Sequence, residues 1–349
     1  MLHNLKLTNS RPLNKSAKPG LTIAILACFV GNPAIAQSEK SGGAKLIDGP
    51  ELSGPIVSGK GHDDAGNADP NTTRKPDEAY GAYQRGYYLT ALELALPRAD
   101  SGDPAAQTLI AEIYWKGLGV ARDKKKAADW YRFAANGGNR TAQFLYANIL
   151  LRGDGLKTDK KEGRKYMEMA AKAGHVRGQF NLAQLMTDER PTWAGYKRAL
   201  PWYEKAAKAG LADAQYAMAN IYADAKGVTT NDDVTARKWL AKAAQGGMDT
   251  AQLEYGVWLA NGRGGEKNET EAFKWLRLAA AQRNIAAQNR IAHAYYAGMG
   301  VKPDQIKSAA WNILAKRGGR TDIILDQHFT RLSDIDKRRA IELANRISK

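Results

Sequence analysis

Cysteine is almost absent from the sequence, and so are the residue patterns on which many enzyme active sites depend. The 349 residues include one cysteine, Cys28, and five histidines. The sequence has no Gly-x-Ser-x-Gly elbow, no cysteine–histidine pair and no His-Glu-x-x-His motif. Without further cysteines the chain can form no internal disulfide, and scattered histidines do not make a zinc site. The sequence therefore predicts a protein that is not an enzyme and that uses neither a metal nor a cofactor.

The chain also lacks an apolar run long enough to cross a membrane. The run Leu21–Val30 has ten residues, whereas a membrane-spanning helix needs about 20. A basic stretch precedes this run, and Ala34-Ile35-Ala36 supplies small residues at the −3 and −1 positions of a cleavage site. This pattern predicts a signal peptide over residues 1–36, cleavage after Ala36, a periplasmic location and no transmembrane span after cleavage. Lipidation of Cys28 is the alternative, because the residues before it faintly resemble a lipoprotein box.

Two segments without regular repeats precede the main part of the chain. Residues 37–76 are rich in Gly, Ser, Asp, Pro and Lys and show no helical or strand periodicity, which predicts a disordered linker. His62, Asp63 and Asp64 in this linker are interpreted as solvated side chains, not as a metal site. Residues 77–101 resemble a degenerate helical hairpin that caps the next unit, and we expect Pro97 to kink or end its second helix.

A repeat of about 36 residues organises residues 102–316. One glutamine and one aromatic residue recur with the same period, and two independent anchors over six copies predict six stacked helical hairpins. We name the two helices of each hairpin helix A and helix B. The glutamines open helix A, at Gln107, Gln143, Gln179, Gln215, Gln252 and Gln288. The aromatic residues lie in helix B, at Trp130, Tyr166, Trp202, Trp239, Trp275 and Trp311.

The residues around these anchors predict how the hairpins pack. Helix A carries large apolar residues three and seven places after the glutamine, with Ala or Gly between them, so one face of helix A is apolar and allows close approach. Glycine loops such as Gly298-Met299-Gly300 separate helix A from helix B. After Lys316 the period stops. Ser333 and Asp336 resemble a capping box, and residues 317–349 are predicted to form C-terminal capping helices.

The succession Ala-x-Ala-Gln, Leu-Ala/Gly, Tyr, Gly-x-Gly-Val, Ala-x-x-Trp and Ala-Ala-x-x-Gly resembles the Sel1-like repeats, a branch of the tetratricopeptide superfamily. The resemblance implies an all-α fold, a right-handed superhelical α-solenoid. The third repeat departs from the pattern, with Glu189, Arg190 and Pro191 in place of the glycine loop. Cysteine-rich members of the family have been described as β-lactamase-like, but a mature chain without cysteine departs from that group, so a hydrolase is only the alternative.

The net charge is +16, which could favour an acidic partner, an anionic lipid or a nucleic acid, or could belong to an ordinary solvated helix surface. No recognition helix or RNA-binding signature is present, so a nucleic-acid partner is not expected. His175 lies at a turn where this repeat family commonly has histidine and is expected to be structural.

The resemblance implies that partner proteins bind along the helices A. Positions one and five after each glutamine form two rows at helical spacing, the first partly aromatic and the second rich in amides. An extended peptide would suit such rows, although the aromatic side chains could equally pack between neighbouring helices A. The predicted groove residues are Glu112, Phe144, Asn148, Phe180, Gln184, Tyr216, Asn220 and His293.

The function predicted on this basis is a periplasmic scaffold or adaptor for protein–protein interactions in envelope regulation or integrity. Its partner would be a protein in the periplasm or at the inner membrane. A glycan-binding or glycan-modifying envelope protein is the alternative, suggested by the aromatic residues Trp115, Trp193 and Tyr296, which we expect to be exposed. These rings could equally pack between repeats, and packing is the favoured interpretation for Trp193 beside Pro191.

Overall fold

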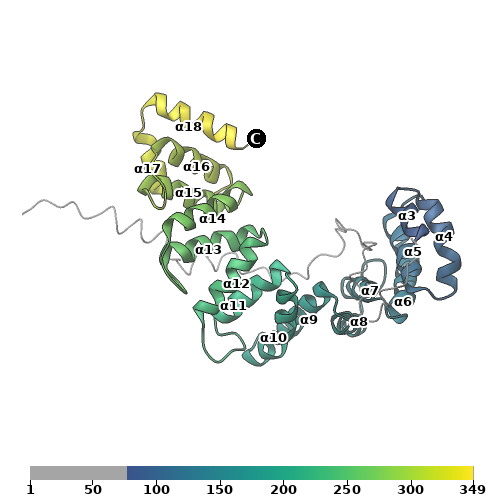
Figure 1. Cartoon of the computed structure of the whole chain (residues 1–349). Coiled ribbons are helices and arrows are strands. Elements are labelled where there is room, and N and C mark those ends of the chain that lie inside the picture. Colours follow the sequence, from purple (N-terminus) through teal and green to yellow (C-terminus); the bar gives the residue numbers. More distant parts are fainter. Residues whose placement is uncertain (1–76, 349) are drawn as a thin grey trace, which may run out of the picture.

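The computed structural model describes residues 77–348, which fold into consecutive helices with no strand among them. Figure 1 shows these helices stacked in chain order along a curved path, with α3 and α4 at one end and α18 at the other. The all-α solenoid predicted from the sequence is confirmed. The predicted signal peptide and linker, residues 1–76, lie outside the described residues. Within the described part, no helix is both long and apolar enough to cross a membrane.

The helices fall into a first pair, six repeats and a last pair. The first pair is α3 (Glu78–Gln84) and α4 (Tyr88–Asp100). The helices A are α5 (Pro104–Lys116), α7 (Arg140–Arg152), α9 (Val176–Glu189), α11 (Ala212–Ala223), α13 (Asp249–Asn261) and α15 (Ile285–Ala297). The helices B are α6 (Lys124–Asn136), α8 (Lys160–Lys172), α10 (Trp193–Lys208), α12 (Asp233–Gln245), α14 (Glu269–Ala281) and α16 (Gln305–Arg317). The last pair is α17 (Ile323–Arg331) and α18 (Asp334–Ile347).

Of the two outcomes expected for Pro97, a kink or the end of the helix, the second does not occur. The helix continues to Asp100 with Pro97 inside it. Proline removes one backbone hydrogen bond, here the bond to the carbonyl of Glu93. Glu93 and Pro97 are both exposed, so water can solvate this carbonyl and the helix tolerates the proline.

Side-chain caps define where the helices B begin. Asp123, at the start of α6, accepts a hydrogen bond from the backbone N–H of Lys126 at 2.9 Å. Each of the other five helices B likewise begins after a residue whose side chain accepts a backbone N–H near the helix start, and such a cap stabilises a helix by about 1 kcal/mol. These N-cap residues are Asp159, Thr192, Asp232, Asn268 and Asp304.

The recurring glutamine ties each helix A to the helix B before it. Its Nε2 donates a hydrogen bond to the carbonyl of an alanine eight residues upstream, near the end of the preceding helix B or, for Gln107, of α4. The bond is 3.1 Å long for Gln143 and Ala135, and the six bonds span 3.0 to 3.5 Å. Each of these carbonyls also accepts a backbone N–H from three residues later, as Ala135 does from Gly138 at 3.1 Å. The glutamine therefore adds a second hydrogen bond at the helix end, and this bond joins the two helices. This bond explains why glutamine marks the period.

The second glycine of the interhelical loop sets the distance between successive repeats. At Gly300, φ is +68°, and a Cβ atom would lie 1.9 Å from the carbonyl oxygen of Glu269 at the start of α14. At Gly264, a Cβ atom would lie 2.1 Å from the carbonyl oxygen of Asp233 at the start of α12. The loop of one repeat therefore rests directly on the first turn of helix B in the preceding repeat, and no side chain fits between them.

The third repeat has a shorter loop and a longer helix B. Helix α9 ends at Glu189 and α10 begins at Trp193, so three residues replace the glycine loop. The indole Nε1 of Trp193 donates a hydrogen bond to the carbonyl oxygen of Val228 at 3.0 Å, in the loop of the next repeat. Trp193 therefore packs between repeats while keeping 47 % of its surface exposed.

A buried polar cluster attaches the last helices to the sixth repeat. Asp322 precedes α17, and one of its oxygens lies 2.7 Å from Nε2 of the fully buried His293 on α15. The same carboxylate accepts hydrogen bonds from Asn289 at 3.1 Å and from the backbone N–H of Leu325 at 3.1 Å. Burial would raise the pKa of Asp322, but the hydrogen bond and charge of His293, with those two donors, hold it well below its usual range.

Candidate interaction site on the helices A

The aromatic row of the predicted groove is largely buried in packing. Phe144 stacks on the ring of His175, with 4.3 Å between centroids, and Phe180 packs edge-on against Tyr203 at 5.7 Å. Tyr216 is half-buried, and its hydroxyl donates a hydrogen bond to Glu254 of the next helix A at 2.6 Å. These contacts favour the packing alternative for this row, because each ring already has a partner within the chain.

His175 has the structural role expected from its position. It is the N-cap of α9, and its Nδ1 accepts a hydrogen bond from the backbone N–H of Gly178 at 3.0 Å. Its ring also covers Phe144 of the preceding repeat. The same side chain thus caps one helix A and packs on another.

The two ends of the second row are occupied by intramolecular contacts. Glu112 is buried; it accepts a hydrogen bond from the hydroxyl of Tyr83 at 2.8 Å and pairs with Lys116 at 2.6 Å. His293 is bound to Asp322 at the other end. Both were predicted as groove residues, and their positions at the ends of the stack hold the terminal helices in place.

Two of the three amides in the middle of the second row, Asn148 and Gln184, are different, because they have buried oxygens without partners among the described residues. Asn148 is only 5 % exposed, and its Nδ2 donates to the carbonyl of Phe144 at 2.9 Å, while its Oδ1 has no partner among the described residues. Gln184, in the next repeat, is also buried and its Oε1 has no partner there. Asn220 is half-buried. A buried acceptor without a partner costs about 1–3 kcal/mol, so these positions are compatible with a bound donor.

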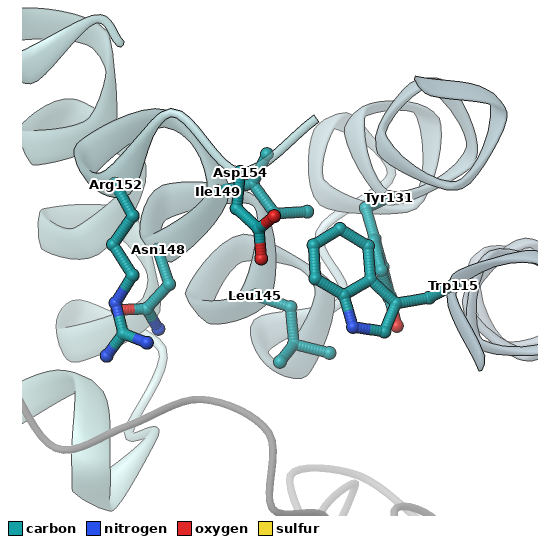
Figure 2. Close-up of a pocket in the computed structure, with 7 residues that line it drawn as sticks. All are labelled: Trp115, Tyr131, Leu145, Asn148, Ile149, Arg152 and Asp154. Atoms are coloured by element: carbon teal, nitrogen blue, oxygen red, sulfur yellow. The ribbon is translucent and has the colours of Figure 1, made fainter. Parts of the chain in front are cut away.

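A shallow pocket, open to solvent on one side, lies beside Asn148 between the first two repeats; its empty space of about 330 Å³ includes open solvent. Figure 2 shows Trp115 and Tyr131 on one side of it, Asn148 and Arg152 on the other, and Leu145 between them. Ile149 and Asp154 complete the lining. The walls thus come from α5 and α7, two neighbouring helices A, while Tyr131 belongs to α6.

The pocket combines apolar walls with polar groups that lack partners. The hydroxyl of Tyr131 is fully buried and has no hydrogen-bond partner among the described residues. Burial, together with the charge of Glu112, raises the pKa of Tyr131 well above its usual value, so the phenol stays protonated and can donate. Asp154 at the rim pairs with Lys124, whose Nζ lies 5.3 Å from the centre of the Trp115 ring. The pocket is therefore an apolar slot, and two of the residues that line it, Asn148 and Tyr131, hold buried polar atoms without partners in the described part of the chain.

Sequence reasoning placed Asn148 in a groove but missed the pocket around it. Trp115, expected to be exposed, is only 7 % exposed, and its ring lines the pocket. Tyr131 follows the helix B anchor Trp130 by one residue and carries no motif of its own. Tyr296, also expected to be exposed, is half-buried against His328 at 4.9 Å between ring centroids. Residues 77–348 hold no cluster of three potential metal ligands.

Comparison with known proteins identifies the repeats. The model of the Sel1 repeat matches six consecutive segments, residues 104–139, 141–175, 176–211, 212–248, 250–284 and 285–319. No curated protein matches the chain.

Two solved structures resemble the chain over most of its length. One is a protective antigen present in uropathogenic Escherichia coli strains, which displays an SLR fold. It is 25 % identical with a TM-score of 0.63, over 77 % of this chain and 60 % of the antigen. The chain thus spans about three fifths of that protein. The other is a Sel1 repeat protein from Oxalobacter formigenes, 28 % identical with a TM-score of 0.59, over 71 % of this chain and all of that one. Six family matches cover more than half of the sequence, so the chain belongs to the Sel1 repeat family, whose members generally act as non-enzymatic scaffolds for protein–protein interactions.

Proposed function

We propose that the chain is an exported scaffold that binds a segment of a partner protein along its helices A, with the pocket beside Asn148 as the main anchor. The observation that carries this proposal is the pairing of an open apolar pocket with two buried polar atoms, Tyr131 Oη and Asn148 Oδ1, that lack partners. Native structures rarely leave such atoms unpaired, and a ligand is one way to satisfy them.

An extended peptide segment has the chemistry that this site requires. Its backbone N–H can donate to the oxygen of Asn148, its C=O can accept from Tyr131, and one of its side chains can occupy the slot lined by Leu145 and Ile149. Gln184, one repeat further along, offers a second unpaired acceptor for the same strand. The apolar side chains of Leu145 and Ile149 in the slot favour an uncharged side chain of the peptide.

The scaffold is proposed to act in the periplasm, in envelope regulation or integrity. This part of the proposal rests on the apolar run Leu21–Val30 and the small residues Ala34 and Ala36. Mass spectrometry of the protein isolated from its native cells should find Gln37 at the N-terminus. A lipidated Cys28 would place the protein on a membrane anchor instead, and an intact Met1 would refute export.

Affinity capture from an envelope extract tests the binding proposal. The chain carrying Asn148→Ala and Gln184→Ala should lose the captured protein, while its melting temperature changes little because both amide oxygens are unpaired. Gln245→Ala is the matched control, since it removes an exposed amide on α12 and should leave capture unchanged. A protein retained equally by wild type and the double variant would place the binding site elsewhere. Capture of oligosaccharide alone would favour the glycan-binding alternative.

A further inference from the structure

Among the helices of the first four repeats, the excess of positive charge lies in one layer of the solenoid. Helices B of these repeats, α6, α8, α10 and α12, contain 16 basic and five acidic residues. Helices A of the same repeats, α5, α7, α9 and α11, contain four of each. The layer of helices A is therefore neutral, and the layer of helices B carries a large excess of positive charge. We call the outer surface of α6, α8, α10 and α12 the basic face.

The cations of the basic face point to solvent and mostly lack carboxylate partners. Of its 16 basic residues, 13 are exposed, whereas all five acidic residues are half-buried. On α8, for example, Lys161, Lys165 and Lys172 are exposed and lie on the side of the helix opposite its buried residues. Eleven of the 13 exposed cations have no carboxylate within 4 Å among the described residues; the two that do are Arg132 and Lys208. Such unpaired charge is available to an anionic partner.

Large apolar rings lie among these cations. Phe133 on α6 and Trp193 on α10 are 48 % and 47 % exposed. The guanidinium of Arg132 lies 5.4 Å from the centre of the Phe133 ring, and Nζ of Lys197 lies 4.8 Å from that of Trp193. Exposed aromatic rings beside long basic side chains are typical of surfaces that sit at the boundary between lipid headgroups and acyl chains.

We propose that the basic face docks on an anionic phospholipid bilayer. Charge complementarity attracts the unpaired lysines to the lipid phosphates, and Phe133 and Trp193 enter the headgroup region. The combination of cations with exposed rings favours a bilayer over a soluble acidic protein, which would not need the rings. The walls of the pocket come from α5 and α7, in the other layer, so a docked scaffold keeps its protein-binding site accessible. This inference is independent of the peptide proposal.

Vesicle sedimentation with the full chain tests the proposal. Vesicles of phosphatidylcholine that contain about 30 % anionic phosphatidylglycerol serve as the probe, and vesicles of pure phosphatidylcholine are the reference. Each lysine near an anionic bilayer strengthens binding by about fivefold. Replacing Lys161, Lys165, Lys172 and Lys205 by glutamine should therefore weaken binding about 100-fold or more, and replacing them by arginine should preserve it.

A matched control separates the basic face from net charge. Lys267, Lys274, Lys307 and Lys316 lie in later repeats, and each is already paired with a carboxylate at 2.7 to 3.0 Å. Their replacement by glutamine removes the same charge and should weaken vesicle binding less than about fivefold. Phe133→Ala should weaken binding severalfold without changing its dependence on salt, because the ring carries no charge.

Three results would overturn the proposal that the basic face docks on a bilayer. Equal losses in the two sets of four lysines would mean that net charge alone acts, and would overturn it. So would equal binding to neutral vesicles, or binding to soluble heparin with no binding to anionic vesicles. Asn148→Ala should sediment with vesicles like the wild type, so failure of the peptide proposal and failure of this one give different results.

Discussion

The close approach of Gly300 to the start of α14 gives a quantitative test of the stacking. Gly300→Ala would place a methyl group 1.9 Å from the carbonyl oxygen of Glu269. Two costs arise from this change. An alanine at φ +68° adopts the left-handed region, which costs about 1–2 kcal/mol. Relieving the overlap requires the loop and α14 to separate, and overpacking of this kind costs about 1–3 kcal/mol. The variant should therefore lose about 2–5 kcal/mol of unfolding free energy.

Gly119→Ala is a matched control for this experiment. Gly119 has almost the same backbone, with φ +70°, but the nearest atom to its added methyl would be Cβ of Tyr88 at 3.3 Å. The control therefore shares the backbone cost of about 1–2 kcal/mol and little of the steric cost. The difference between the two variants measures the spacing role alone.

Urea unfolding followed by circular dichroism gives the two free energies, and hydrogen exchange locates the damage. Because each repeat contacts only its neighbours, Gly300→Ala should weaken protection chiefly in α14 to α18. Equal losses of stability in Gly300→Ala and Gly119→Ala would refute the idea that the second loop glycine acts as a spacer. Uniform loss of protection along the stack would refute the nearest-neighbour description.

Three further changes test other parts of the structure. Arg283 has φ +66° at a position where the other repeats have glycine, so Arg283→Gly should raise the unfolding free energy by about 1 kcal/mol in urea titrations; a loss would contradict this. Trp239→Ala should cost about 3 kcal/mol, because the ring bridges the cores around α10 and α12, and hydrogen exchange should show the loss at that junction. Because the pKa of Asp322 is lower in the folded state, its ionised carboxylate stabilises the fold above the unfolded pKa of about 4. This stabilisation is lost as the pH falls from there towards the folded pKa. The stability gap between wild type and Asp322→Asn should therefore stay constant from about pH 6 to 5 and shrink below about pH 4 in thermal melts; a gap that grows on acidification would reverse the assigned sign.

The solenoid was predictable because its determinants lie within one repeat. The glutamine anchors and the small residue four places later, such as Ala147, mark a face that packs the same way in every copy, and both are buried. The departure of the third repeat was also visible at Pro191. The course of α4 through Pro97 was not, because it depends on whether the carbonyl of Glu93 faces water, which the sequence pattern alone does not show.

The interaction site was harder to predict because it is built across repeats. The spacing within one helix A shows that Phe144 and Asn148 share a face, but only the position of the next repeat decides what covers them. His175 covers Phe144, whereas the buried oxygen of Asn148 has no hydrogen-bond partner among the described residues. The pocket needs Trp115 from one helix A, Leu145 from the next and Tyr131 from the helix between them. Such a combination has no linear motif.

The glutamine hydrogen bonds also bear on the order in which the repeats can fold during synthesis. Each glutamine bonds to an alanine eight residues closer to the N-terminus, so its acceptor already exists when the ribosome adds the glutamine. Gly300 likewise rests on Glu269, in the hairpin made before it. Every new hairpin can therefore dock on a finished one without waiting for residues still to be synthesised, and the short sequence separation of these contacts favours rapid folding. Growth of the nascent chain and growth of the solenoid can proceed together, one repeat at a time.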